Sequence, residues 1–487
     1  MFVAGIPLFL GVMAIVIDIG SFWNSSLHVQ LAAEAAALAG VPYMPGDFTT
    51  ARTVARAEAA KNGYKSPAAT VTAAINTESN RRLDVTVSAA FGTYFLRIFG
   101  MNSVQITRTA TAEYTLPVPM GSPQNFYGDN TATHGLWSAA AMTMGSNRMY
   151  GDAYGTYYNP SPTLNNQYDP NGYAYGIDVP VGAGATNIDL YDPAFCAVDA
   201  NKGTGDHWIA GATTEVSVYY VLWSDPAATP LDYSDDVQVV SSGDLFANIA
   251  AADKSGPNRA STSWPASMAD CTNDPYHDDW WTLATVTTPG TYRLQVTTTN
   301  ALNPSDQLGV SAENMWGLRA IPTNAAYRPN VYGLGKMVIY ANVAAGVTEF
   351  YLGQIDAVHA GKTIVIQLFD PGDASGTSQI EILKPTTNDY TAATFSYTAD
   401  STAAGSKKGT NVTFLRTTIS GAAQYNNAWL TLTVPLPASY NAPHPATESA
   451  AIGGGWWKIR YTFTAATSDT TTWMVSIRGN PVHLVQP

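Results

Sequence analysis

The first twenty residues form a strongly apolar stretch, and no charged side chain precedes Asp18. A helical pattern continues beyond it through an alanine-rich segment, and Gly40 and Pro42 mark its end. A helix over residues 1–39 would be about 58 Å long at 1.5 Å per residue. Such a helix is too long for a bilayer alone and too apolar to stand in water, so it needs a partner surface.

Two partners fit this pattern. The helix is either a permanent membrane anchor that carries an extracellular stalk, or it lies in a membrane only before assembly and is then buried against copies of itself. Alanine-rich surfaces let helix backbones approach closely, which suits the second alternative, but the residues alone leave both open. The side chains expected to form the contact surface are Phe2, Pro7, Leu8, Phe9, Leu10, Val12, Met13, Ile15, Val16, Ile17, Asp18, Phe22, Trp23, Leu31, Ala35 and Leu38.

The stretches PLFLGVMAIVIDIG (7–20) and LHVQLAAEAAALAG (27–40) resemble the N-terminus of TadE/TadG-like proteins of tight-adherence (Flp-type) pilus systems. Asp18 and Gly20 match the V-D-x-G step of that family, and Glu34 stands where the family pattern has aspartate. A second alanine-rich helix at about 49–62 and a strand pair ending at 107–114 extend the resemblance. It implies a pilin-like protein of a prokaryotic cell surface.

A Pro/Gly-rich linker follows at 116–124, and short segments of period-two alternation then predict β-strands. The expected fold is mainly β with one long N-terminal α-helix. A small α+β pilin-like region follows that helix, and two duplicated β-sandwich, jelly-roll-like domains complete the chain. The expected boundaries are 1–40 for the helix, 41–115 for the α+β region, and 121–325 and 326–487 for the sandwiches.

The duplication is inferred from internal similarity. Residues 173–193 align with residues 350–371, and the tryptophan pair at 280–281 is matched with the pair at 456–457. The stretch from Ile355 to Asp373 also resembles the β-sandwich region of long TadG-related proteins. Alternation predicts that four residues of the aligned segments point into the sandwich cores: Ile188, Leu190, Ile366 and Leu368.

The composition narrows the choice of partner. Charged residues make up 13% of the chain, the net charge is −13, and no basic run is present, which argues against nucleic acid. The two cysteines, Cys196 and Cys271, form a disulfide if the protein folds in an oxidising compartment, and are two separate thiols otherwise. The many tyrosines and tryptophans suit subunit contacts or the binding of surface glycans.

Motifs for catalysis are missing from the sequence, which has no HExxH, CxxC, GxSxG or P-loop pattern. Carboxylates in turns are candidate calcium ligands, because calcium prefers oxygen donors. The alternative is that these residues cap turns and lie in solvated loops. The candidate ligands are Asp192, Asp274, Asp278, Asp370 and Asp373.

We therefore expect a structural protein and not an enzyme: a subunit of an extracellular filament that binds copies of itself and lies in the inner membrane before assembly. Calcium is the only cofactor candidate. The competing hypothesis is a membrane-anchored adhesin or accessory pilus protein that binds carbohydrate. In a filament, Asp18 would be a buried unpaired charge, so we expect it to bind a basic group of a neighbouring copy or to face water.

Overall fold

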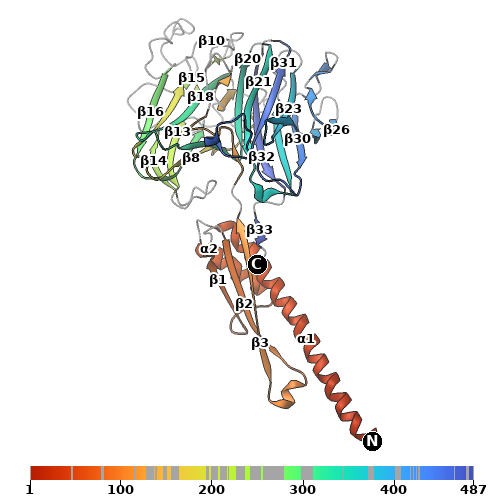
Figure 1. The fold of residues 1–487 in the computed structure, drawn as a ribbon. Coiled ribbons are helices and arrows are strands. Elements are labelled where there is room, and N and C mark those ends of the chain that lie inside the picture. Colours follow the sequence, from red (N-terminus) through yellow and green to blue (C-terminus); the bar gives the residue numbers. More distant parts are fainter. Residues whose placement is uncertain are drawn as a thin grey trace. The chain divides into compact units, whose positions relative to one another are not determined.

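The computed structural model in Figure 1 divides into two compact units. The described residues of unit 1 fall within Met1–Leu116 and Gly479–Pro487, and those of unit 2 fall within Pro117–Pro226 and Tyr233–Arg478. The structure describes residues 2–44, 48–77, 82–114, 117–127, 136–137, 140–145, 151–154, 164–192, 197–198, 207–208, 216–217, 219–225, 236–241, 254–255, 279–297, 311–343, 345–370, 378–400, 407–416, 418–419, 422–423, 425, 428–465, 467–478 and 482–485.

Unit 1 is an antiparallel sheet with two helices. The strand order is β1-β2-β3-β33, so the edge strand β33, which pairs with β3, comes from the C-terminal part of the chain. The elements are α1 (Phe2–Gly40), η1 (Val41–Tyr43), α2 (Phe48–Lys61), β1 (Ala69–Ile75), β2 (Arg82–Gly92), η2 (Leu96–Phe99), β3 (Ser103–Tyr114) and β33 (Val482–Val485). The sequence predicted both long helices correctly, each to within about two residues of its observed ends.

Small side chains fill the contact between the two helices. Ala33, Ala36 and Ala37 of α1 lie in one core with three alanines of α2, Ala51, Ala55 and Ala59. The same core contains Leu83, Val85 and Val87, which alternate along β2 and point toward the helices. Alanine at these positions lets the helix backbones approach closely, so helix propensity and packing favour the same sequence.

Gly40 is needed for this close approach. Its φ of −83° is ordinary helical geometry, and α1 passes directly into η1, so Gly40 ends the helix without the left-handed turn that glycine often supplies. A Cβ at this position would lie 2.6 Å from Cδ2 of Leu83 and 2.7 Å from the carbonyl oxygen of Ala51. The missing side chain therefore serves packing between α1, α2 and β2.

Unit 2 contains two copies of one eight-stranded arrangement. The first copy consists of β7 (Ala140–Gly145), β8 (Tyr173–Val179), β9 (Thr186–Asp192), β13 (Tyr219–Asp225), β14 (Val237–Ser241), β16 (Asp279–Val286), β17 (Gly290–Thr297) and β18 (Ser311–Pro322). The second consists of β20 (Met337–Val343), β21 (Gly346–Gln354), β22 (Thr363–Asp370), β23 (Ser378–Pro385), β24 (Tyr390–Ala392), β30 (Ala428–Pro435), β31 (Trp456–Phe463) and β32 (Thr467–Ile477).

Strand pairing is the same in both copies. One sheet of the first copy has the order β7-β18-β9-β16, and the corresponding sheet of the second has the order β20-β32-β22-β30. The other sheets have the orders β8-β17-β13-β14 and β21-β31-β23-β24. Two antiparallel sheets connected in this order form a jelly roll, which confirms the expected fold class.

The core of each jelly roll lies between its two sheets. The four residues expected to point inward, Ile188, Leu190, Ile366 and Leu368, are all buried in the core of unit 2. In the first copy, Trp316 of β18 packs edge-on against Tyr175 of β8, with ring centroids 4.9 Å apart. In the second copy, Trp473 of the equivalent strand packs edge-on against a phenylalanine of β21. Each core thus contains a fully buried indole ring.

Part of the predicted alignment of the copies is wrong. Trp280 lies on β16 and Trp456 on β31, and these strands are not equivalent, because the counterpart of β16 in the second copy is β30. On the strand pairs that do correspond, Trp280 packs across from Tyr191 at 5.3 Å and Trp429 across from Phe369 at 5.5 Å. The aromatic residue that repeats Trp280 is therefore Trp429.

The two jelly rolls share one continuous sheet. Strands β19 (Asn330–Leu334) and β4 (Pro119–Met120) lie between β8 and β21 and hydrogen-bond the copies together. This grouping differs from the expected boundary at 325/326, because β19 pairs with the first copy. It also differs at the C-terminal end, where β33 belongs to the sheet of unit 1.

We predict that Gly40→Ala destabilises unit 1 by about 1–3 kcal/mol, because its Cβ collides with a backbone oxygen that cannot move aside. The measurement is thermal unfolding followed by the helical circular dichroism signal. Gly20→Ala is the control: it adds a methyl group to the same helix with no atom within 4 Å. The control should gain about 0.5–1 kcal/mol from helix propensity, and equal melting temperatures for both variants would contradict the packing argument.

Candidate assembly surface on the N-terminal helix

The inner face of α1 carries two buried polar side chains, Asp18 and Ser26. Ser26 accepts a hydrogen bond from the guanidinium of Arg108 on β3, with Nη2 2.5 Å from Oγ. Together with Phe22, which packs against the core of unit 1, these residues continue the inner face toward the N-terminus. The helix is thus attached to unit 1 well beyond its alanine-rich part.

Asp18 binds the loop between β2 and β3. Its Oδ1 accepts from the backbone N–H of Tyr94 at 2.7 Å, and its Oδ2 accepts from the N–H groups of Phe95 at 2.9 Å and Leu96 at 2.6 Å. These donors stand at the start of η2, where no helical carbonyl can accept from them. The carboxylate therefore supplies the acceptors that this turn lacks, and we call this contact the Asp18 clamp.

The clamp sets the charge state of Asp18. Burial acts to raise the pKa of its carboxyl, but the three backbone donors and the positive charge of Arg97 outweigh burial and lower the pKa below its ordinary value. Asp18 is therefore not the unpaired charge expected from the sequence. Its hydrogen-bond partners are backbone N–H groups of its own chain.

The outer face of α1 is exposed and apolar. Val16, Trp23, Leu27 and Leu31 follow one another at intervals of seven and four residues, which places them along one side of the helix. Trp23 is 70% exposed and Val16 is 62% exposed. We call these four residues the outer stripe. Isolated exposed apolar side chains are ordinary, but a continuous row of them marks a contact surface.

Most of the expected contact residues with described side chains lie on the exposed side. Met13, Ile15, Val16, Ile17, Trp23 and Leu31 are exposed; Phe22, Ala35 and Leu38 are half-buried; Asp18 is buried. The side chains of Phe2, Pro7, Leu8, Phe9, Leu10 and Val12 lie outside the described set. Sequence reasoning missed Ile19 and Leu27, which are exposed beside them, and the whole loop at 94–101. The signal for the loop was available: TYFLRIFGM is unusually apolar for a turn between two strands.

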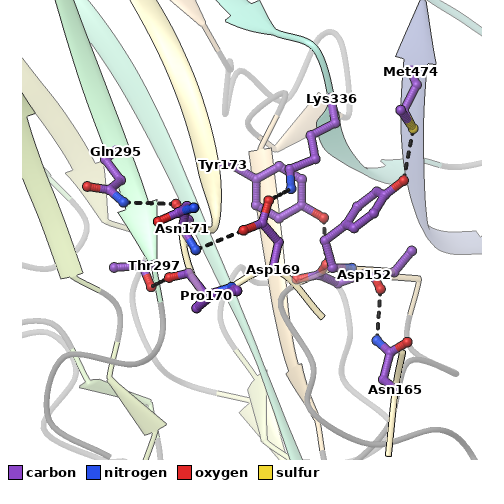
Figure 2. Close-up of polar contacts among 12 residues, drawn as sticks. Asp152, Asn165, Asp169, Pro170, Asn171, Tyr173, Gln295, Thr297, Lys336 and Met474 are labelled. Atoms are coloured by element: carbon purple, nitrogen blue, oxygen red, sulfur yellow. Dashed lines mark hydrogen bonds and ion pairs between the residues drawn. The ribbon is translucent and has the colours of Figure 1, made fainter. Parts of the chain in front are cut away.

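A polar cluster in unit 2 is the other candidate for chemistry (Figure 2). Lys336 forms an ion pair with Asp169 at 2.5 Å, and its ammonium lies 4.3 Å from the ring centroid of Tyr154. Tyr173 donates its hydroxyl to Asp152 at 2.5 Å. Burial, and next the Asp152 carboxylate, raise the pKa of Tyr173 well above its ordinary value, so it remains a neutral donor.

This cluster ties the two jelly rolls together. Tyr173 begins β8 of the first copy, while the hydroxyl of Tyr154 donates to the sulfur of Met474 on β32 of the second copy at 2.9 Å. Lys336 lies in the turn between β19 and β20. Because its members bind one another, the cluster is best explained as a structural link between the copies.

The remaining candidate sites stay predictions. Cys196, Cys271, Asp274, Asp278 and Asp373 fall outside the described residues, and Asp192 and Asp370 end β9 and β22 with their side chains undescribed. Within the described part of the chain, no three His, Cys, Asp or Glu side chains gather as a metal site would require. Among the described residues, no helix has the length and hydropathy needed to cross a membrane.

Comparison with known proteins adds little. No family model matches the chain, and no curated protein matches it. Similar solved structures include the VP2 subviral particle of infectious bursal disease virus, with 11% identity over 76% of this chain and 81% of that one. Another is the Gx strain of the same virus, with 9% identity over 77% and 84%. Both have a TM-score of 0.08, which is too low to support any argument about fold or function.

We predict that Asp18→Asn loosens the β2–β3 loop, because an amide nitrogen replaces one acceptor oxygen and faces backbone donors. Hydrogen exchange at the amides of Tyr94 to Leu96 should accelerate roughly tenfold or more. Glu34→Gln is the control, since Glu34 lies on the same helix and accepts from Gln30 instead. Unchanged protection of the loop amides would contradict the clamp.

The lowered pKa also fixes a pH dependence. A group with a depressed folded-state pKa contributes stability above its unfolded value, ordinarily 3.8, and this contribution disappears as the pH falls through the folded value. Thermal melts of unit 1 below pH 4 should therefore depend less steeply on pH in Asp18→Asn than in the unaltered protein. Parallel curves would show that Asp18 is not the responsible group.

Proposed function

We propose that this protein is a structural subunit of an extracellular, pilus-like filament of a prokaryotic cell surface, which polymerises through α1. The supporting observation is the outer stripe: four exposed apolar residues on a helix whose opposite face is already bound to unit 1. Residues 2–17 of the same helix carry no charge. Copies of α1 are the partners that best match a long apolar surface of this shape, and the jelly rolls are the displayed part.

Energetic estimates favour repeated contacts over a simple dimer. Burying a large apolar side chain contributes about 1.5–3 kcal/mol, so the partly exposed outer stripe offers a gross gain of about 4–7 kcal/mol. Association costs about 4–15 kcal/mol in lost freedom of motion. A single helix–helix contact is therefore marginal. An open array, in which each α1 contacts several neighbours, multiplies the gain per subunit.

The test is Val16→Glu, with filaments observed by electron microscopy and quantified by sedimentation. Burying an unpaired carboxylate costs about 3–5 kcal/mol, which should raise the critical concentration for assembly roughly a hundredfold or more. The matched control is Val347→Glu. Val347 is also 62% exposed, but it lies on β21 of unit 2.

Each outcome decides between the candidate functions. Filaments lost in Val16→Glu and retained in Val347→Glu support assembly through α1. Normal filaments in both variants would show that α1 is not part of the subunit interface. If the unaltered protein forms no filaments and is released from cells only by detergent, the protein is instead a membrane-anchored adhesin or accessory pilus protein.

A further inference from the structure

The loop between β2 and β3 exposes a dense apolar surface. Five large side chains of this loop are exposed, and the two most exposed are Ile98 at 76% and Phe99 at 75%. The others are Tyr94, Phe95 and Met101. Exposed turns between strands usually carry small or polar residues, so five apolar side chains within eight positions mark a surface for a partner. We call these five residues the loop patch.

The loop patch is held in a defined conformation. The Asp18 clamp holds one side of the loop, and the Thr93 hydroxyl donates to the carbonyl of Met101 across its base. The backbone N–H of Thr93 also donates to the carbonyl of Asn102 at 3.2 Å. Gly100 closes η2 in the left-handed conformation that glycine adopts without strain. The apolar side chains are therefore presented by a fixed backbone and do not collapse into the core of unit 1.

The clamp also fixes the position of the loop along the axis of α1. It joins the loop to Asp18, the first charged residue of the helix, and Figure 1 shows α1 continuing past the loop toward the N-terminus. That continuation, Phe2–Ile17, would be about 24 Å long at 1.5 Å per residue and contains no charge. The loop patch thus lies where the apolar part of the chain meets the polar part.

The chemistry of the loop fits the headgroup region of a bilayer. Tyrosine is enriched at that depth because its ring has a polar end, and Tyr94 supplies one, while Phe95 and Phe99 supply apolar rings for the acyl boundary. Arg97 is exposed among them, and its guanidinium can bind a lipid phosphate while the apolar neighbours enter the acyl boundary. The net charge of −13 disfavours an anionic surface, so the suitable lipid is zwitterionic.

We propose that the loop patch is a lipid-contact site that lies in the headgroup region of a zwitterionic bilayer beside α1. This proposal deepens the proposed function, since it concerns the membrane-held state that precedes assembly. The loop and helix contact the membrane as one body because the Asp18 clamp joins them. Assembly then withdraws the loop patch from lipid together with α1.

The experiment uses the full chain and vesicles of phosphatidylcholine. Ile98→Ser combined with Phe99→Ser should lower the partition coefficient in flotation assays roughly tenfold or more. Both side chains are mostly exposed, so the thermal melt should not change. The control is Val181→Ser on unit 2, where the valine is 80% exposed, and it should leave partitioning unchanged. As a measure of depth, Phe99→Trp should add tryptophan fluorescence that lipids brominated near the headgroup quench.

The outcomes separate this proposal from the proposed function. Unchanged partitioning of the double serine variant, or no quenching of the added tryptophan, overturns the lipid contact. Unchanged partitioning with loss of filaments assigns the loop patch to a second copy of the chain instead, which also overturns it. Reduced partitioning supports the proposal even if the unaltered protein forms no filaments, in which case only the filament function fails.

Discussion

Close contact between small side chains on one face of α1 is the constraint on which unit 1 depends. The alanines of α1 and α2 and the absent side chain of Gly40 bring two helices and β2 together without large residues between them. Because that face is used inside the unit, the large apolar residues on the opposite face remain available to a partner. Packing inside unit 1 therefore suffices to divide the helix into a buried inner face and an exposed outer face.

The polar residues of α1 extend this division toward the N-terminus. Among the described side chains of the helix, Asp18 and Ser26 are the buried polar ones, and each is bound to a different part of the β2–β3 hairpin. A carboxylate that binds three backbone donors tolerates burial far better than an isolated one. These contacts consequently hold the hairpin and the apolar N-terminal half of the helix together as one body, although the buried alanines of α1 all lie well C-terminal to Asp18.

The sequence predicted the local elements better than the contacts between them. The helical period and the alanine content of the sequence located α1 and α2. The alternation of apolar and polar residues placed Ile188 and Ile366 in the core correctly. Both signals lie within a few neighbouring residues. The clamp could not be predicted, since the partners of Asp18 are backbone N–H groups more than seventy residues away that carry no side-chain signature. The match of Trp280 with Trp456 failed because resemblance between aromatic pairs does not reveal strand order.

The pairing of β33 with β3 has a mechanical consequence. In the sequence, most of unit 2 lies between these two strands, and the strand ends that face it along the chain, Tyr114 of β3 and Val482 of β33, are paired with each other. A tensile load applied to unit 1 at these two strand ends is therefore shared by β3 and β33, and the eleven residue pairs from Arg82 to Gly92 in the β2–β3 ladder resist it in shear.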